Sequence, residues 1–166
     1  AESLRVEAWG GSRSVGAGLV RPDGPGARGA LSAEALYVFT DRTVELRGAR
    51  VWQLTPTQGA TASVTLGAAA HVVPAPFDVG LGPHAGLNLS LGGPTFTVDL
   101  SLQSGAEFFY ARLAPRLPQR AGLGLQLRLG RWALGVQARM GVDVLPGEGW
   151  VGRGEVVASL AWFDVR

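Results

Sequence analysis

The sequence has only two histidines, His71 and His84, and no cysteine, so few side chains could act as a general base or a metal ligand. A catalytic histidine needs a nucleophile within hydrogen-bond reach and a third group that orients it. Ser63 and Ser90 are candidate nucleophiles by residue type, but no paired His–Ser spacing recurs. A metal site would need a third ligand at a recognisable spacing. We therefore expect both histidines to be hydrogen-bonded structural residues, and we predict no catalytic residue, no metal site and no cofactor.

Charged residues make up 17% of the chain, below the roughly 25% typical of soluble domains. The net charge is +2 and the arginines are dispersed, so no basic patch points to nucleic acid. Most charged residues share one face of the segments described below, where opposite charges are roughly balanced. We expect part of this face to form a polar network. Its predicted members are Glu45, Arg47, Asp99, Glu107, Arg120, Arg128, Arg139, Arg153 and Glu155.

The elements that must position these residues are β-strands, because apolar and polar residues alternate along most of the chain. In residues 132–143, Trp132, Leu134 and Val136 begin an apolar face, while Gly135, Gln137 and Arg139 lie on the opposite, polar one. Successive side chains of a strand point to opposite faces, whereas a helical period would scramble these two sets. The same alternation runs through residues 60–72, 77–91, 96–103, 120–130 and 153–162.

Gly- and Pro-rich turn signals separate the alternating segments. They fall at residues 22–26, 56–59, 74–76, 92–94, 115–118, 130–131 and 146–149. Seven turns give eight strands, and two weaker candidates at residues 10–11 and 40–43 would raise the count to ten. Bacterial barrels have even strand numbers, so both counts are admissible. We favour eight, because the extra turns lack strong signals and half-strands around residues 10–11 would fall short of the roughly 9–11 residues that span a membrane.

The apolar face is expected to point outward, into lipid. A lumen of this size is just wide enough for side chains to fill, which suits a polar face of small residues with a few long ones. Large aromatic residues also gather near the ends of the segments, as in the two girdles that mark membrane interfaces. The predicted interfacial aromatics are Trp52, Phe77, Phe96, Tyr110, Trp132, Trp150 and Trp162.

Two arginines fall on the lipid face by strict alternation. Arg112 lies beside a predicted outer loop, where a charge costs little. Arg50 lies within a predicted strand, and we expect a bulge or a change of phase there.

The chain resembles the small eight-stranded outer-membrane barrels, such as the transmembrane domain of OmpA or the OmpX proteins. The likeness covers nearly the whole chain and rests on pattern and size. In that family the last strand usually ends in an aromatic residue, whereas here Asp164-Val165-Arg166 follow Trp162 and Phe163. The predicted fold is all-β: a closed antiparallel up-and-down transmembrane β-barrel, as a single domain over residues 1–166.

The expected function is that of an integral bacterial outer-membrane barrel with a structural, anchoring or envelope-assembly role. Its expected partners are the lipid bilayer and other envelope proteins, with no nucleic acid. Three alternatives remain open: a narrow channel through the barrel, a lipid-modifying barrel enzyme that uses serine and histidine, and a soluble lipocalin-like binder with the two faces reversed.

Overall fold

The computed structural model describes residues 2–24, 26–57 and 59–165. The ends of the predicted domain, residues 1 and 166, and residues 25 and 58 of two predicted turns lie outside the described residues. No helix within the described ranges has the length and apolar character needed to cross a membrane. The described residues form eleven β-strands: β1 (Glu2–Gly11), β2 (Ser14–Pro22), β3 (Gly29–Val38), β4 (Thr43–Thr57), β5 (Ala60–Pro74), β6 (Phe77–Gly92), β7 (Phe96–Gly105), β8 (Glu107–Phe109), β9 (Ala114–Leu129), β10 (Trp132–Leu145) and β11 (Gly149–Val165).

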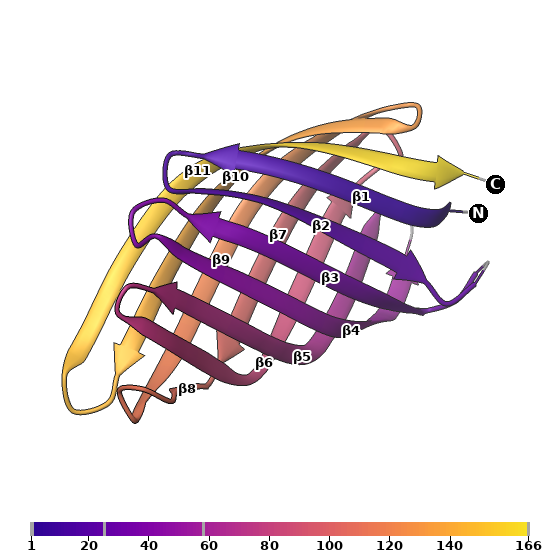
Figure 1. Ribbon diagram of the computed structural model, residues 1–166. Coiled ribbons are helices and arrows are strands. Elements are labelled where there is room, and N and C mark those ends of the chain that lie inside the picture. Colours follow the sequence, from indigo (N-terminus) through magenta and orange to yellow (C-terminus); the bar gives the residue numbers. More distant parts are fainter. Residues whose placement is uncertain (1, 25, 58, 166) are drawn as a thin grey trace.

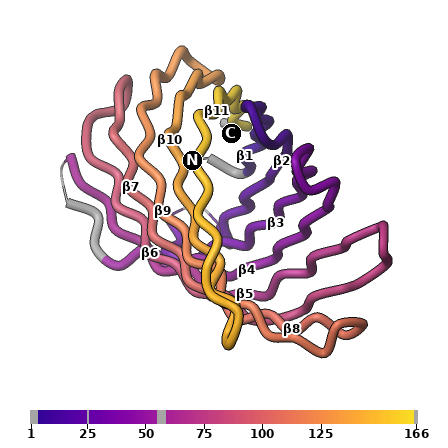
Figure 2. Tube along the Cα trace, turned by 90° about the vertical axis from the view of Figure 1, so that its left-hand side faces the viewer, coloured from indigo at the N-terminus to yellow at the C-terminus, as the bar shows by residue number. Residues whose placement is uncertain are grey.

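All these strands belong to one antiparallel sheet, which closes because β1 pairs with both β2 and β11 (Figure 1, Figure 2). β7 and β8 share a single place between β6 and β9, so the wall has ten strand positions. The predicted all-β, closed, up-and-down barrel is confirmed. The favoured count of eight strands was wrong, and the alternative of ten is correct, so the likeness to eight-stranded barrels does not extend to strand number.

The count of eight strands omitted two tight turns, and these two turns are hydrogen-bonded to each other. One turn is Ser12-Arg13 and the other lies at residues 39–42, where Arg42 adopts a φ of 53°. The amide of Phe39 donates to the carbonyl of Arg13 (2.8 Å), and Arg13 Nη2 donates to Thr40 Oγ1 (3.2 Å). β1 and β2 have 10 and 9 residues, long enough to span a membrane after all. A contact between two hairpins leaves no local Gly-Pro signal.

The predicted turn at residues 115–118 was also wrong. The chain turns at residues 110–113, where Leu113 has a φ of 52°. The two prolines of the predicted turn, Pro115 and Pro118, lie inside β9. Proline donates no hydrogen bond and is tolerated in a sheet only where the ladder is interrupted or ends. The ladder is interrupted here at Ala106, between β7 and β8, beside Pro83 of β6 and near Pro118.

The alternation places apolar side chains outside and polar ones inside, as predicted. Leu123, Leu125 and Val136 are 51%, 50% and 55% exposed on the outer face, whereas Glu45 is 1% exposed inside. A soluble binder needs the reverse arrangement, so that alternative is wrong. Both termini lie at one end of the barrel (Figure 1). At the other end, the hairpins β5–β6, β8–β9 and β10–β11 extend the barrel on one side (Figure 1).

A small apolar cluster lies on the inner face of the barrel, where β1, β3 and β11 contribute its residues. Trp9 of β1 is buried with Leu36 and Val157. Its ring lies over Gly16 of β2, where a Cβ atom would come within 2.4 Å of Trp9 Cζ2. Glycine is therefore required at position 16, because the indole fills the space that a side chain would occupy.

We expect Gly16→Ala to lower the free energy of unfolding by about 1–3 kcal/mol, the usual cost of overpacking a filled interior. The matched control is Gly10→Ala, because nothing lies within 4 Å of a Cβ atom at Gly10. Urea unfolding of the barrel in lipid vesicles measures both variants. Equal stability of the two would contradict the predicted packing of Trp9.

Candidate functional site: the polar lumen

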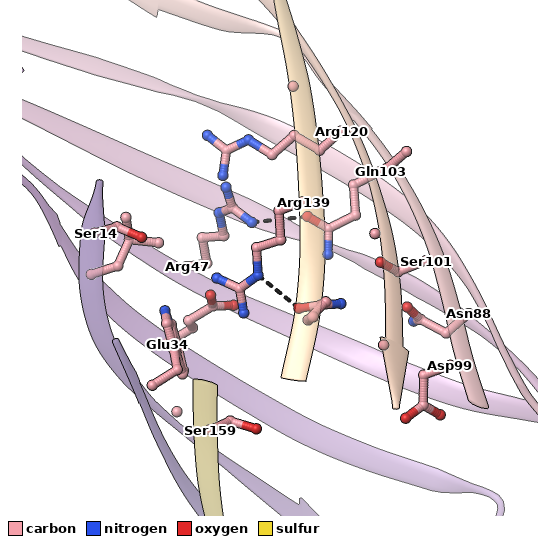
Figure 3. Close-up of a pocket in the computed structure, with 18 of the residues that line it drawn as sticks. Ser14, Glu34, Arg47, Asn88, Asp99, Ser101, Gln103, Arg120, Arg139 and Ser159 are labelled. Atoms are coloured by element: carbon pink, nitrogen blue, oxygen red, sulfur yellow. Dashed lines mark hydrogen bonds between the residues drawn. The ribbon is translucent and has the colours of Figure 1, made fainter. Parts of the chain in front are cut away.

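A cavity of about 570 Å³ occupies the barrel interior (Figure 3). At the end that carries the termini its walls include Asp99 and Gln126, and at the opposite end they include Arg13 and Asp41. Serine, asparagine and glutamine side chains line much of the space between. The cavity therefore extends along the barrel interior and is not confined to one strand.

An ion-pair network, here named the central cluster, forms part of the wall of this cavity. Its members are Glu45, Arg47, His71, Glu107, Arg116, Arg120 and Asp143.

Glu45 of β4 ties two separated parts of the wall together. Its Oε1 accepts a hydrogen bond from Nε of Arg47 (2.7 Å), and its Oε2 accepts one from Nη2 of Arg120 on β9 (3.0 Å). Arg47 Nη1 in turn donates to Gln103 Oε1 of β7 (2.8 Å). Because β4 is not a neighbour of β7 or β9 in the sheet, these bonds cross the lumen.

Arg116 of β9 organises the second half of the central cluster. It donates to Glu107 from both Nε and Nη2, with the Nε bond at 3.0 Å, and its Nη1 lies 3.3 Å from an oxygen of Asp143. Its Nη2 also lies 3.0 Å from Nδ1 of His71, which is 3.8 Å from Glu45. His71 thus connects the two halves and is hydrogen-bonded, as expected from the sequence.

Glu45, His71 and Glu107 bring three possible metal-ligand atoms within 4.8 Å of one another. Their carboxylates are, however, already hydrogen-bonded to guanidinium groups, which supply both the donors and the compensating charge. The chemistry of this group is that of a buried salt-bridge network.

The structure brings only part of the predicted polar network together. Glu45, Arg47, Glu107 and Arg120 belong to the central cluster. The other five members lie inside the barrel but outside that cluster: Asp99 accepts from Ser90, Arg153 pairs with Asp41, Glu155 accepts from Ser14, Arg139 donates to Gln137, and Arg128 lies over Phe163.

The barrel interior contains three aromatic rings whose inner position was not predicted from the sequence: Trp9, Phe109 and Phe163. Each is buried and lies under an arginine, with Arg139 Cζ 5.1 Å from the Trp9 ring and Arg128 Cζ 4.3 Å from the Phe163 ring. A guanidinium over an aromatic face gains cation–π attraction. The alternation in the sequence indicates their position, because all three rings fall in the phase of the polar face. Aromatic residues were considered there only as markers of the membrane interface.

The predicted interfacial aromatics all lie on the outer face near strand ends. Trp52, Phe77, Phe96, Tyr110, Trp132 and Trp150 are exposed, and Trp162 is partly buried opposite Trp132.

The predicted bulge or change of phase at Arg50 was wrong. Its register neighbours Leu31 and Leu66 both point outward, so the alternation is kept. Arg50 is instead neutralised on the outer face by Asp23, with Nη1 2.7 Å from Oδ1. Arg112 lies beside its loop as expected, and its Nε donates to Asp78 (3.0 Å).

His84 departs from the expectation that both histidines are hydrogen-bonded. Its two ring nitrogens are buried and have no partner among the described residues. The reason lies in the register, which places glycines, Gly67 and Gly105, on either side of it. Ser63 and Ser90 line the cavity, and within the described part of the chain neither forms a hydrogen bond to a histidine.

Solved structures that match this chain include a porin and an outer-membrane channel. The NanC porin matches with a TM-score of 0.52 and 11% identity, over 99% of this chain and 100% of that chain. The channel DcaP of Acinetobacter baumannii matches with a TM-score of 0.46 and 14% identity, over 95% of this chain, which spans 54% of the length of that protein. No protein-family model and no curated protein matches the sequence. The likeness to the NanC porin shows a shared fold.

We expect Glu45→Gln to lower the free energy of unfolding by about 3 kcal/mol, because removing one partner of a buried ion pair leaves the other charges uncompensated. The matched control is Glu148→Gln in the exposed turn between β10 and β11. Urea unfolding in vesicles, followed by the heat-dependent shift of the folded barrel on gels, measures the difference. Similar stabilities of the two variants would show that Glu45 does not brace the lumen.

Proposed function

We propose that the protein is an integral outer-membrane β-barrel whose lumen forms a narrow, water-filled passage for small hydrophilic solutes. The observation that carries this proposal is the cavity inside the barrel, whose lining includes residues near both ends of the barrel and members of the central cluster.

The outer surface supports insertion into a membrane. Closure of the sheet pairs the backbone groups of every strand, which the hydrocarbon region demands. Leucine and valine side chains cover the wall between two sets of exposed aromatics. Two arginines lie on this wall within strands: Arg50 of β4 pairs with Asp23, and Arg21 lies one residue from the end of β2. A bacterial outer membrane suits these features, because spanning barrels of this kind are typical of it.

The size of the cavity sets the class of solute. Spread over the roughly 25 Å height of the apolar band of such barrels, 570 Å³ corresponds to a mean cross-section of about 23 Å². That area admits water and small ions, whereas folded chains and large oligomers are excluded. The passage is therefore a restricted one.

A structural or anchoring role in the envelope is the second candidate. It is favoured by the bonds of Glu45, which join β4 to β9 across the lumen and would stiffen the barrel. In that case the cavity would hold trapped water only, and other envelope proteins would be the functional partners. An enzymatic role has no such support, because no serine–histidine pair is formed within the described residues.

Membrane insertion predicts different quenching of two tryptophans by lipids with brominated acyl chains. In a variant that keeps only Trp132 of the five tryptophans, fluorescence should fall strongly, because this ring is 50% exposed on the outer face. In a variant that keeps only Trp9, which is buried inside the barrel, fluorescence should change little. Equal quenching of both would contradict the assignment of the faces.

If the lumen is a passage, the protein should give single-channel current steps in planar bilayers, and a reagent attached to the cavity wall should block that current. The chain has no cysteine, so Ser101→Cys would place a unique thiol on the cavity wall, and a charged, membrane-impermeant thiol reagent should reduce its current at least twofold. The control is Leu102→Cys, because Leu102 is 60% exposed on the outer face, where lipid shields the thiol. Absence of steps from folded wild-type protein would favour the structural role instead.

A further inference from the structure

The charges of the central cluster are unequally exposed to the passage. The Glu45 and Glu107 side chains are 1% and 2% exposed, because they lie against the wall beneath the guanidinium groups. Arg120, by contrast, is 32% exposed and points into the cavity (Figure 3). Arg120 is therefore the guanidinium group of the central cluster that a solute in the cavity can reach most easily, whereas Glu45 and Glu107 are shielded.

Two arginines that line the cavity, Arg120 of the central cluster and Arg139 outside it, have hydrogen-bond donors without a partner among the described residues. Arg120 donates to Glu45 from Nη2 alone, and Arg139 donates from Nε to Gln137 (2.7 Å). Among the described residues nothing accepts a hydrogen bond from the terminal nitrogens of Arg139. Glu34, Glu155 and Glu7 lie within electrostatic reach of Arg139, but no hydrogen bond joins any of them to it within the described residues. Guanidinium nitrogens without acceptors favour an anionic ligand, which would complete their hydrogen bonds.

The sheet register sets these two arginines side by side. Arg120 of β9 pairs with Gly141 of β10, and Arg139 of β10 pairs with Gly122 of β9. The two arginines are thus diagonal neighbours on the inner face, with Cβ atoms about 7–8 Å apart or somewhat less. A Cβ atom at Gly141 would make only ordinary contacts, the nearest at 3.6 Å, so a side chain fits there beside Arg120. Both side chains also line the cavity (Figure 3).

We propose that Arg120 and Arg139 together form a binding subsite for small anions that carry a carboxylate or phosphate group. The planar donor fork of each guanidinium matches the paired oxygens of these groups. Ser101 and Gln103, which line the same cavity, supply neutral hydrogen-bonding groups around the bound anion. The subsite rests on the proposed passage for its physiological use, because the passage brings the solute to it, but binding itself needs only the folded barrel.

Binding of inorganic phosphate to the detergent-solubilised barrel, measured by calorimetry, tests the subsite directly. The wild-type protein should bind phosphate, and Arg139→Gln and Arg120→Gln should each weaken binding at least tenfold. The matched control is Arg131→Gln, which removes an exposed arginine at the turn between β9 and β10 and should leave the affinity unchanged. No binding by the wild-type protein, or an equal loss in the control, would overturn the proposal.

A second variant keeps the test valid if loss of Arg120 disturbs the central cluster. Gly141→Asp retains both arginines and places a carboxylate in the open space beside Arg120. This internal anion should compete with phosphate and weaken its binding at least tenfold, while the heat-dependent gel shift reports a folded barrel. Unchanged phosphate affinity in folded Gly141→Asp would place the phosphate elsewhere.

Conductance separates this inference from the proposed function. In a salt gradient the wild-type channel should prefer chloride to potassium, and Arg139→Gln should move the permeability ratio toward one. Phosphate binding by a barrel that shows no conductance would leave the subsite standing and remove the passage. Conductance without phosphate binding would keep the passage and remove the subsite.

Discussion

The pairing of backbone groups is the constraint on which the rest of this structure depends. A wall that faces hydrocarbon can leave no amide or carbonyl without a partner, and a closed sheet is the strand-based way to meet that requirement. Closure through β1 and β11 then gives every strand one inner and one outer face. Polar side chains have only the interior available, so charge becomes concentrated in a lumen where it must be compensated.

Compensation takes two forms in this lumen. Carboxylates are bonded to guanidinium groups, as in the contacts of Glu45 with Arg47 and Arg120. Other guanidinium groups lie over the buried rings of Trp9 and Phe163, which combine apolar packing with cation–π attraction. Together these contacts fill much of the interior without an apolar core of ordinary size. They also explain why glycine is needed on the inner face, where a long side chain on one strand takes the space of its neighbour.

The same network has opposite consequences for rigidity and for passage. Bonds across the lumen hold β4 near β9, which stiffens the barrel and narrows the opening. The remaining space is lined by arginines, carboxylates and neutral polar groups, and Arg120 is the most exposed arginine of the central cluster. The two candidate functions differ mainly in whether the remaining space is continuous for a moving solute.

The amino-acid sequence by itself determined the class of fold and the two faces of the strands from residue 60 onward in which the alternation was traced, because alternation is a local property with a period of two residues. It also indicated the inner position of Glu45, Arg120 and Arg139. Only the tertiary structure decided the strand number, since the turn at Ser12-Arg13 is supported by a neighbouring hairpin and prolines in β9 are tolerated beside an interrupted ladder. The tertiary structure also decided which charged side chains form ion pairs. The distance between Glu45 and Arg120 depends on how the closed sheet folds across its own lumen, and no spacing along the chain encodes that distance.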